Sequence, residues 1–407
     1  MNNLFWIGLL LILGYIAGMI SNRFRLPKVS GYILVGILLS PSFSHILPQS
    51  FLSSTDNVVH FSLAVIAFLI GGSLKYKNVR KLQTTILSVM FSASEMTFIV
   101  VSLGLFFILP YISVQALAFE SYKEYLFIAL FLGAIGAATA PAEVLAVIHQ
   151  YKANGPLTTT LLGVVATDDA VALINFSLVL SVASLIQGNS DTTLVWSLLE
   201  LVLMVLLSLL LGLVAGWLQT YHIRAENRES SLMISTFGSL LIIYTLAEYF
   251  GLDGLLTCIA YGMTITNLST KSDAIFKVIQ MHFEEIIFVL FFVISGASIE
   301  LEVLAVVWPI ALLYVVLRMI GKIGGSWFGA TLSNADPVIK KYAGIGQMPQ
   351  TGVAIGLALI LYHNPDFTAI GSIVLNTIIA ATAVNAVIGP YLLKRVLFKA
   401  NEAKETE

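Results

Sequence analysis

The stretch Gly163-Val164-Val165-Ala166-Thr167-Asp168-Asp169-Ala170-Val171-Ala172 places two adjacent carboxylates near the middle of an otherwise apolar run. At the centre of a membrane-spanning helix, each such charge costs about 2.5–3.5 kcal/mol on insertion scales. The pair therefore has to be neutralised by a proton, a cation or a basic partner, and two like charges this close compete for protons. The stretch predicts a proton- or cation-binding site within a membrane. The alternative is a buried polar pair that only fixes helix packing.

The composition around this stretch indicates that lipid is the solvent. Of the 407 residues, 58% are hydrophobic and only 11% are charged, whereas a soluble domain carries about 25% charged residues. The net charge of −2 gives no sign of a nucleic-acid partner or a polybasic anchor. The N-terminus lacks the positive region of a secretory signal, so we expect the first apolar segment to be retained.

Apolar segments recur along the whole chain, and a helix needs about 20 such residues to cross a bilayer. We predict an all-α polytopic membrane protein with thirteen transmembrane helices, a single transmembrane unit over 1–396 and a short cytoplasmic tail over 397–407. The predicted spans are 3–22, 28–41, 57–74, 84–110, 124–149, 157–187, 194–220, 230–250, 251–267, 276–298, 302–330, 337–362 and 367–396.

The basic residues support an orientation with the N-terminus outside and the C-terminus inside the cell. Cytoplasmic loops carry an excess of Lys and Arg. With thirteen crossings, the inside loops, the tail and the adjoining helix ends hold all of the 21 basic residues except Lys123, Arg318 and Lys322. A wrong helix count would scramble this asymmetry, so the distribution supports both the count and the orientation.

The chain also resembles itself at an offset of seven predicted helices. The stretch 68–72 (FLIGG) resembles 292–296 (FVISG), and Gly31 to Gly36 more loosely resembles Gly254 to Gly262. An odd offset puts the two copies in opposite orientations, which is the inverted-topology repeat of many secondary transporters. The alternative is chance, because Gly and Phe recur in any membrane protein.

Two predicted helices are interrupted at related positions. The stretches 139–143 (TAPAE) and 347–352 (QMPQTG) place Pro141 and Pro349 in mid-membrane, and each proline follows a glycine at the same spacing. Proline frees a backbone carbonyl, and free carbonyls at this depth are tolerated where they are buried in protein or line a wet cavity. They can coordinate a cation or be balanced by a side chain. The alternative is an ordinary proline kink.

Several polar side chains accompany these interruptions. Thr139 and Thr167 could offer oxygens to an ion, and Gln350 adds an amide beside Pro349. Glu143 would balance the N-terminus of a half-helix. These residues support the predicted site around the two aspartates.

The opposite charge comes from the predicted helix over 302–330. Arg318 and Lys322 are four residues apart and share one helix face. We predict Lys322 as the partner of one aspartate, because glycines around it allow close helix approach. Arg318 always stays charged, so we expect a fixed counter-charge there, with snorkelling to an interface as the alternative.

At these residues the sequence resembles the monovalent cation:proton antiporter superfamily, especially the second cation:proton antiporter family. The resemblance spans essentially the whole chain and is carried by 26–32 (LPKVSGY), 68–71 (FLIG), 167–169 (TDD) and 321–324 (GKIG). The Asp-Asp pair is similar to the ion site of electrogenic sodium:proton antiporters. The resemblance implies the sodium:proton antiporter fold, and Glu143 departs from the Asp that the best-known sodium antiporters have in the broken helix.

The resemblance also implies roles. Asp169 would bind the transported monovalent cation, and Asp168 would exchange its partner Lys322 for a proton or an ion. Helices over about 84–187 and 302–396 would form a mobile core that moves as an elevator. Helices over about 1–74 and 230–298 would form a dimeric scaffold, and the helix over 194–220 would link the two.

We therefore predict a homodimeric cell-membrane antiporter that exchanges Na⁺ for H⁺, with Li⁺ and K⁺ as further candidate ions, and that needs no cofactor and is not an enzyme. Other functions remain open, namely a sodium-coupled symporter of an organic anion and a cation channel. An intramembrane aspartyl protease needs acids that face each other from different helices, whereas Asp168 and Asp169 are neighbours about 100° apart on one helix.

Overall fold

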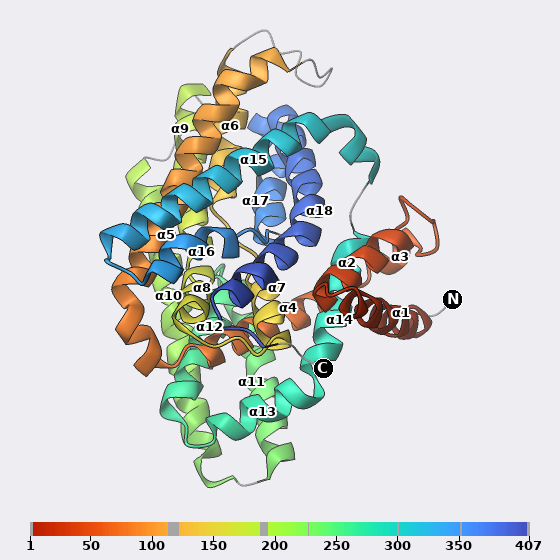
Figure 1. The fold of residues 1–407 in the computed structure, drawn as a ribbon, viewed down its shortest axis with the longest axis vertical. Coiled ribbons are helices and arrows are strands. Elements are labelled where there is room, and N and C mark those ends of the chain that lie inside the picture. The colour runs from red at the N-terminus through yellow and green to blue at the C-terminus, as the bar shows by residue number, and fades with distance from the viewer. Residues whose placement is uncertain are drawn as a thin grey trace. The chain divides into compact units, whose positions relative to one another are not determined.

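A computed structural model describes residues 3–112, 122–187, 194–226, 228–298, 301–350 and 352–404. Over these ranges all regular structure is helical (Figure 1). The chain divides into two compact units. The first comprises Met1–Leu82, Pro141–Gln150 and Val202–Ser298, and the second comprises Gln83–Ala140, Tyr151–Leu201 and Ile299–Glu407.

The helices of the first unit are short or moderately long. They are α1 (Asn3–Arg23), α2 (Lys28–Leu39), α3 (Gln49–Leu52), α4 (Asp56–Ser73), α7 (Pro141–Gln150), α11 (Glu229–Tyr249), α12 (Gly254–Leu268), α13 (Ser272–His282) and α14 (Glu284–Ala297). The helices of the second unit are α6 (Tyr122–Gly136), α8 (Pro156–Val165), α9 (Asp168–Gln187), α15 (Leu301–Leu332), α16 (Pro337–Gly346), α17 (Gly352–His363) and α18 (Thr368–Lys399). Two long helices, α5 (Tyr76–Ile108) and α10 (Leu194–His222), contribute residues to both units.

Nine helices of the described ranges are long and apolar enough to cross a membrane, or ten when the bent pair α13–α14 counts as one span. The other predicted spans contain the shorter apolar helices Lys28–Leu39, Gly254–Leu268 and Val353–Tyr362. A helix satisfies its own backbone hydrogen bonds, which lipid cannot do. The protein is therefore an all-helical, multi-pass membrane protein. The count of thirteen crossings and the N-out, C-in orientation stay predictions.

In the first unit, helices cross where glycines remove the side chain. A Cβ atom on Gly36 of α2 would lie 2.3 Å from the Val293 carbonyl of α14, and one on Gly296 would lie 2.4 Å from the Ile33 carbonyl of α2. The same reciprocity joins α4 and α12, where Cβ atoms on Gly71 and Gly262 would lie 2.1 Å and 2.2 Å from opposing carbonyls. The glycines of the repeated stretches are thus the points of closest helix approach.

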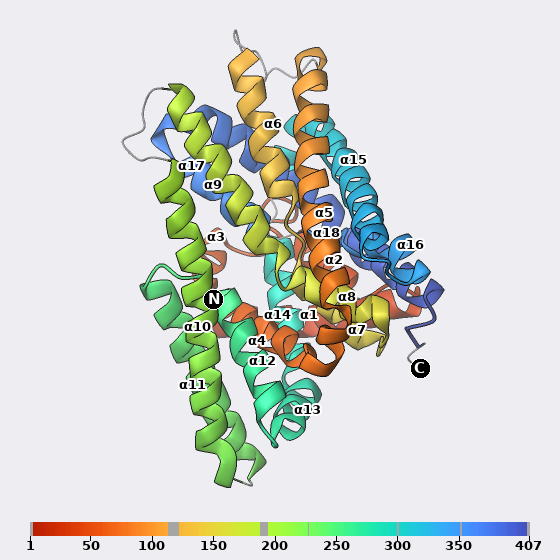
Figure 2. The same ribbon diagram turned by 90° about the vertical axis from the view of Figure 1, so that its left-hand side faces the viewer.

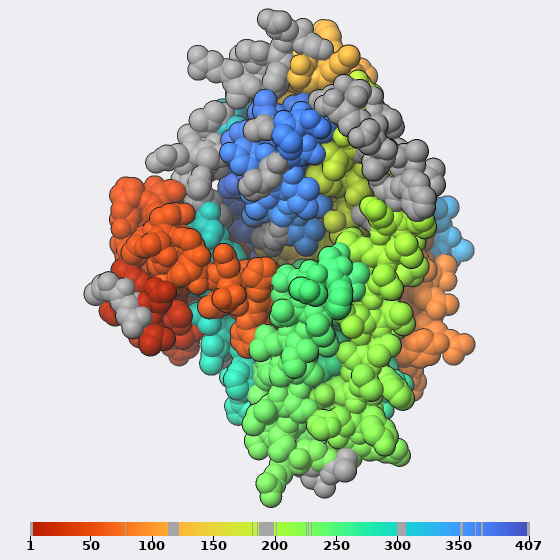
Figure 3. Space-filling view, turned by 180° about the vertical axis from the view of Figure 1, so that it is seen from behind, coloured from red at the N-terminus to blue at the C-terminus, as the bar shows by residue number. Residues whose placement is uncertain are grey.

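The outer face of the first unit is apolar. On the face seen in Figure 3, parts of α10 and α11 (green) lie at the surface. Large apolar side chains on these helices are exposed, including Leu206, Leu210, Trp217, Ile234 and Ile242. Exposed apolar side chains along these helices fit a boundary with lipid or with another protein.

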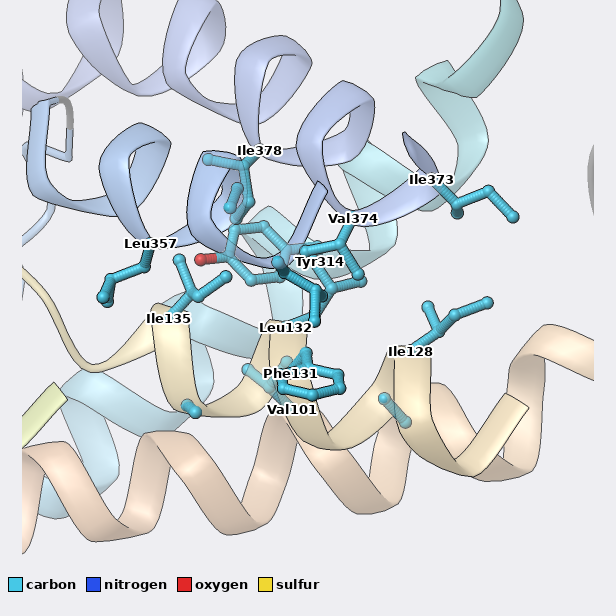
Figure 4. Packing of buried hydrophobic residues seen from close by; sticks show 14 of the residues in the cluster. Val101, Ile128, Phe131, Leu132, Ile135, Tyr314, Leu357, Ile373, Val374 and Ile378 are labelled. Atoms are coloured by element: carbon cyan, nitrogen blue, oxygen red, sulfur yellow. The ribbon is translucent and has the colours of Figure 1, made fainter. Parts of the chain in front are cut away.

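The second unit is built around a cluster of buried aliphatic and aromatic side chains. Figure 2 shows α6 and α9 side by side, and these two helices pack together. In Figure 4, Tyr314 of α15 lies among Ile135, Leu357 and Val374, which come from three other helices. Against α5, α15 presents Gly325, where a Cβ atom would lie 2.3 Å from the Ser92 carbonyl. This packing fixes α15 beside the interrupted helices.

Two helix breaks differ from the predicted spans. The predicted helix over 157–187 is interrupted: α8 ends at Val165 and α9 begins at Asp168. No proline stands there, but the Thr167 hydroxyl donates to the carbonyls of Gly163 and Val164 at 2.9 Å and 3.2 Å. Such side-chain bonds compete with the helical ladder, and aspartates favour the first turn of a new helix.

The predicted helix over 276–298 is likewise wrong as a single helix. It bends by 53° between α13 and α14. Glu284 and Glu285 form the acidic first turn of α14, and this position favours negative charge because of the helix dipole.

Candidate functional site

A backbone hydrogen bond of the second unit links the segment that precedes Pro141 to the segment around Pro349. The Ala140 amide, just before Pro141 at the start of α7, donates to the Pro349 carbonyl at 3.0 Å. Pro349 is buried against α18, where a Cβ atom on Gly389 would lie 2.8 Å from the proline Cα. Both non-helical segments are therefore held inside protein, as membrane depth requires.

Arg318 neutralises the carbonyls that these interruptions release. Its guanidinium group is 1% exposed and donates to the carbonyls of Gly136 at 3.1 Å, Ala138 at 2.8 Å, Met348 at 2.8 Å and Gln347 at 3.3 Å. The C-terminal ends of α6 and α16 carry partial negative charge. Arg318 thus lies buried as a fixed counter-charge between two half-helix ends and does not reach an interface.

Lys322 lies one turn further along α15 and pairs with Asp168. Its Nζ atom is 3.2 Å from Asp168 Oδ2, and neither side chain has any exposed surface. The ammonium group also donates to the Ala137 carbonyl at 2.5 Å and to Thr139 Oγ1 at 3.0 Å. Gly344 of α16 permits this arrangement, because a Cβ atom there would lie 2.6 Å from the Lys322 carbonyl.

Thr139 connects the two charges. Its hydroxyl accepts from Lys322 and donates to Asp168 Oδ2 at 2.5 Å. A buried carboxylate needs donors as well as an opposite charge, and the Thr139 hydroxyl supplies one from the broken segment that follows α6. One carboxylate oxygen is therefore shared by a hydroxyl and an ammonium group.

The second aspartate has a different setting. Asp169 is also in the first turn of α9 but is partly exposed, whereas Asp168 is fully buried. The hydroxyl of the neighbouring Thr167 is engaged by backbone carbonyls of α8. The structure thus distinguishes a buried, lysine-bound carboxylate from an accessible one on the same helix turn.

Gln350, which the sequence analysis assigned to the site, and Gln347, Ser326, Tyr314 and Asn385, which it did not assign, complete the surroundings. Gln347 accepts from Lys322 at 3.4 Å through its side-chain oxygen and donates to Ser326 at 2.9 Å. The side-chain amide of Gln350 donates to Tyr314 at 2.8 Å, and its oxygen accepts from Asn385 at 3.3 Å. The sequence signal that could have identified these residues is the presence of amide and hydroxyl side chains within apolar, membrane-spanning runs.

Glu143 belongs to the first unit. It lies in the first turn of α7 with no exposed surface. The helix dipole favours a carboxylate at this position. Pro141 occupies the first position of the same helix, where its missing N–H costs nothing.

The geometry permits competition at one carboxylate. Within the described residues of the site, Arg318 is surrounded by carbonyls, so Lys322 is the cation that shares Asp168. Asp168 can bind a proton or a metal ion only if it gives up Lys322. A lysine is the basic residue that readily loses its proton on burial.

Residues 8–399 match the family described as sodium/hydrogen exchanger, transmembrane. The chain belongs to this family. The monovalent cation:proton antiporter superfamily predicted from the motifs is thereby confirmed, while the assignment to its second family and the role of the Asp-Asp motif stay predictions.

Relatives and solved structures of the exchanger family agree with this placement. The chain is 26% identical over 389 residues to the Na(+)/H(+)-K(+) antiporter GerN of Bacillus cereus, covering 92% of each chain. It is 22% identical over 312 residues to Na(+)/H(+) antiporter 1 of Methanocaldococcus jannaschii, covering 74% of this chain and 69% of that one. The structure of the sodium proton antiporter MjNhaP1 from the same organism at pH 8 has the same fold, with a TM-score of 0.72, 20% identity and coverage of 98% and 96%. These relatives are transporters, which fits the expectation of a protein that is not an enzyme.

Proposed function

We propose that the chain is a secondary antiporter that exchanges Na⁺ for H⁺ across the cell membrane. The observation that carries the proposal is the buried trio of Asp168, Lys322 and Thr139. The carboxylate of such a trio can hold an ammonium group, a proton or a metal ion, and these occupants exclude one another. Membership of the exchanger family and relatives named as Na⁺/H⁺ antiporters support the proposal.

The proposed cycle begins at the accessible carboxylate. Na⁺ replaces a proton on Asp169 and then binds Asp168, which releases Lys322. An ammonium group without its carboxylate is costly in a site with no exposed surface, so Lys322 gives up its proton to water. On the other side, one proton returns to Asp169 and one to Lys322, which pairs with Asp168 again, and Na⁺ leaves. Two protons therefore move against each Na⁺, and the exchange is electrogenic.

The proposed movement is an elevator. The core over about 84–187 and 302–396 would carry the site across the membrane against the scaffold over about 1–74 and 230–298, with 194–220 as the link. The division of the chain into two compact units supports this assignment, although it groups 141–150 with the first unit. Two scaffolds would form the homodimer, with both N-termini outside and both C-termini in the cytoplasm.

The experiment is cation-induced proton flux in proteoliposomes that hold a pH-sensitive dye. We expect Na⁺ to dissipate an imposed pH gradient in wild type, with Li⁺ and K⁺ compared across pH. Asp169→Asn should abolish the response, while Asp273→Asn, whose side chain is 90% exposed, should retain it. Full activity of Asp169→Asn would refute the site. Cation flux that needs no counter-ion would indicate a channel. Na⁺ flux that depends on an added organic anion would indicate a symporter.

A further inference from the structure

The segment that follows α18 returns to the start of α8. Both Glu402 carboxylate oxygens accept backbone amides there, Oε1 from Leu157 at 2.8 Å and Oε2 from Thr158 at 2.7 Å. The Thr158 hydroxyl also donates to Oε2 at 2.7 Å. These amides are among those that a helix start leaves without an intrahelical partner, so Glu402 fills the N-terminus of α8.

The main chain holds Glu402 in this place. Asn401, which follows the C-cap Ala400 of α18, has a positive φ of 57°, and the Glu402 amide donates back to the Leu397 carbonyl at 3.1 Å. The Glu402 carbonyl accepts from the Asn154 amide at 2.9 Å. This is the turn that commonly closes a helix, here used to aim one carboxylate at another helix.

Tyr151 fixes the segment on its other side. Its carbonyl accepts from the Lys404 amide at 2.9 Å, and its ring lies 4.7 Å from the Lys394 ammonium group. Burial raises the pKa of Tyr151 to about 12. The Tyr151 hydroxyl therefore stays protonated over the pH range in which an antiporter would be assayed.

Gly155 leaves the room that Glu402 occupies. A Cβ atom at this position would lie 2.2 Å from the Glu402 Cδ atom, so any side chain there displaces the carboxylate. The φ of Gly155 is 165°, which any residue adopts. Space for Glu402 is therefore the physical reason for glycine here.

The cap of α8 differs from other caps of the described chain in its origin. Asp253 caps α12 and Asp336 caps α16 from within three residues of the amides they accept. Glu402 reaches Leu157 from 245 residues away. The ten residues of α8 then lead through a two-residue turn directly to Asp168, so the tie fixes one end of the element whose other end carries the site.

We propose that Glu402 is a positioning residue for the ion site. This proposal rests on the proposed exchange function. Glu402 anchors the start of α8 and thereby sets where the turn before Asp168 lies relative to Lys322. Charged acceptors at a helix N-terminus are among the stronger hydrogen bonds of proteins. Loss of the anchor loosens α8 and weakens cation binding without removing any group that touches the ion.

The test compares Glu402→Gln and Gly155→Ala in full-length protein reconstituted in proteoliposomes. Each variant disrupts the contact between the Glu402 carboxylate and the start of α8, one by changing the carboxylate and the other by filling the space beside it. We expect each to raise the apparent KM for Na⁺ by about threefold to tenfold and to displace the pH profile, with a smaller change in maximal rate. The double variant should be no worse than the more affected single variant, and Glu402→Asp should recover part of the affinity.

Matched controls separate this role from folding. Asp273→Asn removes one carboxylate from a side chain that is 90% exposed, and Gly238→Ala adds a methyl group where nothing lies within 4 Å; both should transport like wild type. Loss of folded protein with unchanged KM and pH profile in the folded fraction would overturn the proposal, as would additive effects in the double variant. An inactive wild type would instead contradict the proposed function.

Discussion

The two units differ in the groups that lie between their packed helices. In the first unit, α2 meets α14 and α4 meets α12 through reciprocal glycines, and opposing backbone carbonyls fill the space of the missing side chains. In the second unit, the centre holds Arg318, Lys322 and Asp168, all at most 1% exposed. The first arrangement gains packing from small residues, whereas the second carries charges that are expensive in lipid.

This difference indicates a division of labour. At these glycines the contact is with opposing backbone, which does not titrate. A buried lysine–aspartate pair is weak evidence for stability, because apolar packing often does as well. A role in transport explains why the pair is there, because Asp168 can exchange Lys322 for an ion.

The largest effect is expected from Arg318→Met. The substitution keeps an unbranched side chain but leaves the carbonyls of Gly136, Ala138 and Met348 without their donor. We expect a loss of about 3–5 kcal/mol of stability, seen as early thermal unfolding in detergent, and a smaller loss for Arg318→Lys. Unfolding at the wild-type temperature would mean that the half-helix ends need no counter-charge.

An intermediate effect is expected from Gly71→Ala in the first unit. The new methyl group would meet the Ile259 carbonyl at 2.1 Å, and overpacking costs about 1–3 kcal/mol. The apparent KM for Na⁺ of the folded fraction should not change, because no ionisable group is touched. Gly238→Ala is the control and should be neutral or stabilising, as alanine exceeds glycine inside helices. If Gly71→Ala changed the apparent KM for Na⁺ and Gly238→Ala did not, the proposed difference between the two units would be contradicted.

A smaller effect on stability, but a clear one on transport, is expected from Thr139→Ala. The hydroxyl joins Lys322 and Asp168, and its loss should cost about 1 kcal/mol. We expect the apparent KM for Na⁺ to change by about fivefold, with Thr139→Ser close to wild type. Equal kinetics in Thr139→Ala and wild type would show that the hydroxyl is not part of the exchange.

Much of this arrangement could be read from residue types. Ionisable residues in apolar runs singled out Asp168, Asp169, Lys322 and Arg318, because lipid makes each of them costly. Glycine and proline spacing singled out the interrupted helices over 124–149 and 337–362. These signals sufficed for the membrane class and the family.

The hydrogen-bond partners that the main chain supplies could not be predicted from the sequence. The carbonyls that surround Arg318 belong to residues of no distinctive type, such as Ala138 and Met348. The break before Asp168 has neither proline nor glycine and depends on the Thr167 hydroxyl. The cap on α8 joins residues 245 positions apart. Backbone geometry and long-range contacts leave no local pattern in a single sequence.

The central claim is that the aspartate pair trades protons for a cation. Its most direct test is proton release from purified protein in weakly buffered detergent solution when NaCl is added, with choline chloride as the blank. The account predicts Na⁺-dependent acidification by wild type and none by Asp169→Asn of equal thermal stability. Undiminished acidification by that variant, or none by folded wild type at any pH, would contradict it.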